Sequence, residues 1–175
     1  MNPLRLFHIS HDDAITEFIP RPSPSYFEGL HTDCVFAVNQ ELITNYLLPR
    51  DCPRVCYRIG KQTKESDAER FFSNTTAQAV IAIESAWHYK VCSLGVVQYE
   101  FDTTNFTLLD ENAGYYISSH REYPIGKQLI HNLPLELHTL NIELRIVPKL
   151  WQLHDDVVQS SLQFSCIRMR NAQKR

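Results

Sequence analysis

The sequence predicts a single α+β domain over residues 1–175, with a mixed or mostly antiparallel, bent sheet and two or three helices. Three observations support this class. Segments that alternate apolar and polar residues, as strands do, outnumber helical segments. The helical segments do not alternate regularly with the strands, as they would around a doubly wound parallel sheet. The 175 residues, 43% of them hydrophobic, suffice to bury one packed core without a metal or a disulfide.

The first third of the chain is expected to place a compact unit after an extended loop. A strand opens the chain at residues 4–10, with apolar residues on both faces, and a short helical turn begins at His11. Three prolines make residues 19–25 a stiff loop. The expected elements that follow are a buried strand at 34–38, a helix from about Gln40 that Pro49 ends, a charged corner at 50–53 and a strand at 54–59.

The rest of the chain adds one longer helix and further strands. Residues 60–69 are polar and are expected to form an exposed loop. A well-buried helix is expected at 77–90, because its apolar residues cover a broad stripe. Strands are expected at 94–101, 114–118, 141–147 and 162–170, helical turns at 134–140 and 149–158, and a segment after Pro124 near 128–132. The basic tail at 171–175 is expected to fray.

The composition argues against several classes of protein. A formal net charge of -3 is too close to neutral to indicate a nucleic-acid partner or a membrane surface. No run of about 18 apolar residues is present, which predicts no spanning helix, and the first residues lack the apolar region of a signal peptide. Five cysteines without paired short spacing indicate free thiols in a reducing compartment. The expected location is therefore cytoplasmic, and the oligomeric state is left open.

Several motifs of known reactions are absent from the sequence. It contains no glycine-rich phosphate loop, no dinucleotide-binding glycine pattern, no zinc-protease helix pair and no nucleophile elbow. Cys52 and Cys56 lie four positions apart, but Pro53 stands between them and no second such pair exists, which disfavours a zinc site. No metal is expected, and it stays open whether the protein is an enzyme.

Two polar side chains stand among apolar strand neighbours and are candidates for function. His8 needs a partner for its ring nitrogens, and that partner is either a backbone carbonyl in the core or a substrate. Glu143 either forms an ion pair with Arg145, which shares its face of the strand, or lies in a cleft where it accepts hydrogen bonds.

Three further residues of the central unit are candidates for ligand binding. Tyr46 is either a core residue or a platform for a ligand ring. Arg50 and Arg54 can hold an anion such as a phosphate group, since guanidinium groups bind phosphate through paired hydrogen bonds. The alternative is a corner in which Asp51 bridges the two arginines.

Four segments resemble a small family of uncharacterised bacterial proteins. They are residues 6–10, 20–22, 49–54 and 164–172, and together they extend the resemblance over nearly the whole chain. This family implies no known activity.

A second resemblance concerns chemistry, and it is to ADP-ribosyltransferase-like domains. These domains carry a histidine on the first strand, which matches His8. Their strand and helix with aromatic residues are similar to residues 35–37 and to Asn45 with Tyr46, although Phe36 stands where the family has tyrosine. Their late-strand glutamate is similar to Glu143.

The second resemblance implies a role for each of these residues. His8 would bind a ribose hydroxyl, and Phe36 and Tyr46 would stack on the nicotinamide ring of NAD as substrate. Glu143 would hold the 2′-hydroxyl and stabilise an oxocarbenium-like centre, and Arg50 or Arg54 would meet the diphosphate. The implied function is a transferase or hydrolase acting on NAD or ADP-ribosyl groups. The alternative is a non-catalytic module that binds a nucleotide or a protein.

Overall fold

The computed structural model describes residues 3–23, 27–28 and 30–175, and the chain divides into two compact units. The first unit comprises Met1–Tyr46 and Val96–Ile130, and the second comprises Leu47–Gly95 and His131–Arg175. Each unit contains one sheet, and the described residues also form four α-helices, which confirms the predicted α+β class. The strands form two sheets where the sequence predicted one. The single domain predicted over residues 1–175 stays a prediction.

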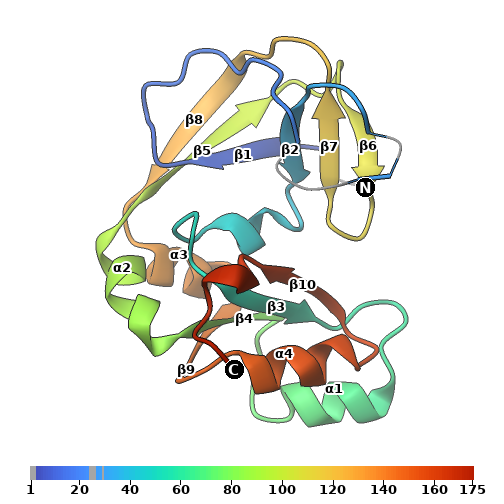
Figure 1. The fold of residues 1–175 in the computed structure, drawn as a ribbon, viewed down its shortest axis with the longest axis vertical. Coiled ribbons are helices and arrows are strands. Elements are labelled where there is room, and N and C mark those ends of the chain that lie inside the picture. Colours follow the sequence, from blue (N-terminus) through green and yellow to red (C-terminus); the bar gives the residue numbers. More distant parts are fainter. Residues whose placement is uncertain (1–2, 24–26, 29) are drawn as a thin grey trace. The chain divides into compact units, whose positions relative to one another are not determined.

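The first unit is built on a six-stranded antiparallel sheet (Figure 1). Its strands lie in the order β6-β7-β2-β1-β5-β8. The strand bounds are Leu6–Ser10 for β1, Val35–Asn39 for β2, Val96–Phe101 for β5, Thr107–Asp110 for β6, Tyr115–Ser118 for β7 and Pro124–Ile130 for β8. The helix predicted from Gln40 is only one turn of 3-10 helix, η1 (Ile43–Tyr46).

Successive residues of β1 point to opposite faces of this sheet, and each face carries its own hydrophobic cluster. The first cluster, on what we name the Leu6 face, comprises Leu6, Val35, Ala37, Phe101 and Phe106. The second cluster, on the Phe7 face, comprises Phe7, Val38, Leu42 and Ile43. The expectation that the opening strand has apolar residues covered on both sides is confirmed.

The second unit is built on a four-stranded mixed sheet with helices (Figure 1). Its strand order is β10-β3-β4-β9, in which β4 and β9 are parallel and the other pairs are antiparallel. The bounds are Arg54–Arg58 for β3, Ala79–Glu84 for β4, Ile142–Val147 for β9, Gln163–Ile167 for β10, Glu65–Phe72 for α1, His88–Ser93 for α2, Leu133–Thr139 for α3 and Trp151–Val158 for α4.

The helix predicted at 77–90 is wrong in its first half, which is the strand β4. All six residues of β4 are buried, because β3 and β9 flank the strand and side chains cover both of its faces. A strand buried on both sides has no alternation of apolar and polar residues. Its continuous apolar run therefore resembles a buried helix segment. Helical structure follows only at η2 (Ser85–Trp87) and α2.

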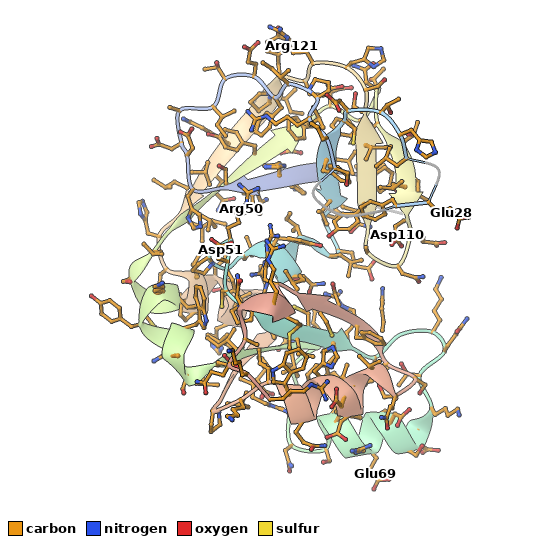
Figure 2. The ribbon with its side chains drawn as sticks, viewed as in Figure 1. Glu28, Arg50, Asp51, Glu69, Asp110 and Arg121 are labelled. Atoms are coloured by element: carbon orange, nitrogen blue, oxygen red, sulfur yellow. The ribbon has the colours of Figure 1, made fainter. Side chains whose placement is uncertain are left out.

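The exposed loop predicted at 60–69 is wrong in its second half, where α1 begins at Glu65. The helix buries Phe71 and Phe72 in the core of the second unit, beside Val55 and Tyr57. Figure 2 shows Glu69 on the outer side of this helix. The polar residues that suggested a loop form the solvent-facing side of an amphipathic helix.

The frayed tail predicted at 171–175 is also wrong, because the second unit holds these residues in place. The backbone N–H of Gln173 donates to both carboxylate oxygens of Glu84, at 3.1 and 3.0 Å. The Gln173 carbonyl accepts a hydrogen bond from the indole of Trp151 at 2.6 Å. Arg175 forms an ion pair with Asp155 at 2.9 Å.

Smaller differences concern connecting segments. Residues 11–13 form bends where a helical turn was predicted. In the proline-rich loop, Arg21 and Cys34 exchange backbone hydrogen bonds, whereas Pro24 and Ser25 lie outside the described residues. The segment after Pro124 is the edge strand β8. Among the described residues, no helix has the length and apolar character needed to cross a membrane.

Candidate functional site

The predicted site residues are shared between the two units. His8, Phe36 and Tyr46 belong to the first unit, whereas Arg50, Arg54 and Glu143 belong to the second.

His8 bridges strands β1 and β2 at the point where their regular pairing ends. The register of β1 and β2 covers only Leu6 with Asn39 and Phe7 with Val38. At the next position, Nδ1 of His8 lies 3.0 Å from the carbonyl oxygen of Phe36. This contact agrees with the backbone-carbonyl alternative for His8. The imidazole thus supplies a link that the backbone ladder no longer makes.

Phe36 and Tyr46 lie in a group of four half-buried aromatic residues, which we name the ring cluster. Its members are Phe27, Phe36, Tyr46 and Tyr115. The Phe36 ring centre lies 5.9 Å from that of Phe27 and 6.1 Å from that of Tyr115. The ring centres of Tyr46 and Tyr115 are 6.0 Å apart, and the two hydroxyl groups share a hydrogen bond. Both aromatic residues predicted to bind a ring are therefore in one group.

The turn at the end of β2 brings Tyr46 next to Tyr115. The Asn39 side chain accepts a hydrogen bond from the Leu42 N–H at 2.9 Å and so starts the turn that leads to η1. The Asn39 N–H donates to the carbonyl of Gly114 at 2.9 Å. Gly114 has φ of +67°, and a Cβ there would lie 2.8 Å from the Asn39 side-chain oxygen. Glycine is therefore required at this contact.

The first unit places His8 and the ring of Tyr46 against different faces of the sheet. His8 packs against Phe18, with ring centres 5.0 Å apart, and Phe18 packs on the cluster of the Leu6 face. Tyr46 and Tyr115 pack on the cluster of the Phe7 face. His8 thus contacts the backbone of Phe36, and the rings of Phe36 and Tyr46 both pack against Tyr115 in the ring cluster. The rings of His8 and Tyr46 are not brought together.

Glu143 is held by its neighbours in the second unit. Its carboxylate forms an ion pair with Arg145 at 2.7 Å, as the ion-pair alternative predicted. Arg145 also donates to the hydroxyl of Tyr57 at 2.7 Å. Burial alone would raise the pKa of Glu143, but hydrogen bonds from Arg145 and Thr75 and the positive charge of Arg145 bring it below its usual value. Glu143 is therefore an oriented, ionised carboxylate at neutral pH.

Tyr57 lies beneath this ion pair and stays protonated at neutral pH. Burial raises the pKa of Tyr57 to about 12. Its hydroxyl oxygen accepts the hydrogen bond from Arg145, so the guanidinium is oriented from two sides. Sequence reasoning missed Tyr57 and Thr75 as supports of Glu143, because they come from different segments of the second unit.

The two predicted arginines differ in accessibility. Arg54 is only 2% exposed, and its guanidinium donates to the carbonyls of Pro49 at 3.3 Å and Cys52 at 2.8 Å. Its hydrogen bonds stabilise the backbone of the corner, and its burial leaves it inaccessible to a diphosphate. The Arg50 side chain is exposed, and Figure 2 labels it beside Asp51 at the corner before β3.

The segment after β10 holds this corner from outside. The Arg168 guanidinium donates to the carbonyl of Arg50 at 3.3 Å, and the Asn171 amide donates to that of Asp51 at 2.8 Å. Arg168 itself has a left-handed backbone conformation, with φ of 54°. Sequence reasoning missed this role for Arg168 and Asn171. Within the part of the chain that the structure describes, no group of three or more metal-ligating side chains occurs.

Sequence comparison adds a family but no chemistry. The family model described as "Family of unknown function (DUF6886)" matches residues 7–172. This finding confirms the predicted uncharacterised family, whereas its bacterial origin and the ADP-ribosyltransferase-like resemblance stay predictions. No curated protein and no solved structure matches the chain.

Proposed function

We infer a function from the contacts of the chain, because it belongs to the family of unknown function DUF6886 and that family implies no activity. The proposed function is that the first unit binds a nucleotide of the NAD or ADP-ribose class. A flat ring of the nucleotide would lie against the ring cluster. The finer proposal is that the protein is a transferase or hydrolase acting on the ADP-ribosyl group.

The ring cluster is the observation that supports this proposal. Its four aromatic side chains are half-buried, so they are both fixed in place and partly open to a ligand. An aromatic contact adds about 0.5–1.5 kcal/mol beyond the area that it buries. The shared hydrogen bond between Tyr46 and Tyr115 orients two of the rings before a ligand arrives.

The contacts within the first unit support proposed roles for three of its residues. Phe36 and Tyr46 keep the stacking role that the resemblance implies. His8 would act as a positioning residue, because its bond to the Phe36 carbonyl holds β2 where the ring cluster needs it. The ribose contact implied for His8 stays a prediction. Glu143 and Arg50 belong to the second unit, and the roles that the resemblance implies for them, as the reacting carboxylate and the partner of the diphosphate, stay predictions.

A non-catalytic nucleotide-binding module is the second candidate. The observation that favours it is that both side chains predicted from the sequence to take part in a reaction already have partners within the protein. Nδ1 of His8 is paired with a backbone carbonyl, and Glu143 is paired with Arg145. Structural roles of this kind account for both residues without a reaction.

Thermal unfolding with and without ligand tests the binding proposal. A ligand at about 100 times its dissociation constant should stabilise the protein by about 2.7 kcal/mol. NAD or ADP-ribose should therefore raise the unfolding midpoint of the wild type, and Phe36→Leu should reduce the shift. Tyr89→Leu is the control, because Tyr89 is 80% exposed and lies in the second unit. If NAD, ADP-ribose and nicotinamide all leave the wild-type midpoint unchanged, the binding proposal is wrong.

Release of nicotinamide from NAD tests the reaction separately. The wild type should release nicotinamide over time, as measured by chromatography, and Glu143→Gln should abolish the release while NAD still shifts the unfolding midpoint. Binding of NAD by the wild type without any release would reject the transferase or hydrolase proposal and favour the non-catalytic module.

A further inference from the structure

Helix α2 carries an exposed thiol and an exposed imidazole in contact. Sγ of Cys92 lies 3.3 Å from Nε2 of His88. The two residues are four positions apart, so one helical turn places them on the same side of α2. Both side chains are exposed. We propose that His88 and Cys92 form a reactive pair at which a small disulfide compound exchanges to form a mixed disulfide, independently of the proposed nucleotide site.

The other four cysteines are in different environments. Cys34, Cys52 and Cys56 are buried, and Cys166 is partly buried. Burial raises the pKa of Cys52 to about 11 and that of Cys56 to about 12. Burial also raises the pKa of Cys166 to about 11. These thiols are protonated at neutral pH, and Cys92 is the one cysteine of the five that is exposed.

The helix keeps the pair on the solvent side. Val91, next to Cys92, is fully buried, and α2 packs against α3. The buried anchor fixes the rotation of the short helix, so His88 and Cys92 face outward together. On the same helix, Lys90 places its amine 4.6 Å from the centre of the Trp87 ring. That contact directs the Lys90 charge toward the indole.

A nucleophile and a base within hydrogen-bonding distance are the two parts that thiol exchange needs. Nε2 of His88 accepts the proton of the Cys92 thiol. The thiolate then attacks one sulfur of the small disulfide, forming a new S–S bond while the original S–S bond breaks. The leaving thiolate takes the proton from His88. The products are a mixed disulfide on Cys92 and one small thiol, and no oxidant other than the disulfide is consumed.

The test uses the reduced full-length chain with oxidised glutathione as the small disulfide. Mass spectrometry should find one rapidly added glutathionyl group, on the peptide that contains Cys92. Cys92→Ser should remove it. His88→Gln should slow the reaction by about tenfold or more. A positioned base contributes about 10²–10⁴-fold in catalysis, and a smaller factor is expected here because the pair is exposed to water. The exposed position should leave the unfolding midpoint of His88→Gln close to that of the wild type.

Two controls make the result decisive. His120→Gln changes an exposed histidine of the first unit and should leave the rate unchanged. His88→Ala should slow the reaction as His88→Gln does, which separates loss of the base from any effect of the glutamine. The proposal is overturned if rapid modification survives Cys92→Ser, or if both His88 variants react at the wild-type rate.

Discussion

Glu143 is oriented by Arg145, whose guanidinium also binds the hydroxyl of Tyr57. A half-buried carboxylate in such a network has one fixed direction and stays ionised. The same arrangement suits a residue that stabilises positive charge in a reaction and a residue that only joins β9 to β3. At the scale of single residues, the contacts therefore define the geometry of Glu143 and leave its role to the nicotinamide-release measurement.

The pH dependence of stability follows from the lowered pKa of Glu143. Burial opposes ionisation, but the hydrogen bonds from Arg145 and Thr75 outweigh it. The folded state therefore binds the proton more weakly than the unfolded state does. The stabilisation is present above the unfolded pKa of about 4.3 and is lost as pH falls through the lower folded pKa.

We therefore expect Glu143→Gln to be less stable than the wild type by about 1 kcal/mol near pH 7. The difference should narrow at an acidic pH below the unfolded pKa of about 4.3, because the wild-type carboxylate then takes up a proton. Urea unfolding at both pH values measures the two differences. Glu69→Gln, on the outer side of α1, is the control and should change stability by less than about 0.5 kcal/mol. An equal deficit of Glu143→Gln at both pH values would contradict the argument.

At the scale of elements, β4 is the strand on which the second unit depends. It is paired with β3 on one side and with β9 on the other, and all six of its residues are buried. Its side chains contribute to both faces, with Val80 and Ala82 in the cluster that includes Phe71 and Phe72. A shorter side chain on β4 would therefore leave a cavity that no exposed side chain nearby can fill.

Ile81→Ala should lower the free energy of unfolding by about 2–5 kcal/mol, because it opens a cavity in a fully buried strand. Ile146→Ala on the neighbouring strand β9 is the matched control. Ile146 is 44% exposed, and its truncation should cost about 1 kcal/mol or less. Chemical denaturation of both variants measures the difference, and equal costs would contradict the central position of β4.

At the scale of the whole molecule, each unit is assembled from two distant stretches of sequence. In the second unit, Glu84 at the end of β4 joins them. Glu84 as a residue is 1% exposed, and its carboxylate accepts hydrogen bonds from the N–H groups of Leu150 at 3.3 Å and Gln173 at 3.0 and 3.1 Å. A charge buried so fully needs these donors. Hydrogen bonds to this buried carboxylate therefore hold the exposed tail to the second unit.

Gln173→Pro should destabilise the protein by about 1–3 kcal/mol or more, because it removes the N–H group that donates hydrogen bonds to both carboxylate oxygens of Glu84. Gln173→Ala keeps this N–H group and should be close to the wild type. Thermal or urea unfolding of both variants gives the comparison. In a Glu84→Gln background the cost of Gln173→Pro should shrink, since the buried charge is gone. A full cost in that background would show that Glu84 is not the reason.

The ring cluster shows which contacts between residues can be expected from the sequence and which cannot. Phe36 and Tyr46 were expected to act on one ring, because the ADP-ribosyltransferase-like resemblance pairs them within one strand-and-helix segment, and that role stays a prediction. Tyr115 follows 69 positions after Tyr46 and reaches it only through the pairing of β2 with β7 and the turn at Gly114. Phe27 likewise contacts Phe36 through packing of their rings. Contacts over such sequence separations leave no period in the sequence.

The sequence by itself determined the α+β class, the alternating strands such as β1, β5 and β9, and the membership of an uncharacterised family, because these depend on local alternation and on residue identity. Only the tertiary structure decided that 79–84 is a strand, that Arg54 is closed to a ligand and that Glu84 holds the tail. The physical reason is that burial on both sides of a strand and the choice of a distant hydrogen-bond partner are set by the neighbours in space.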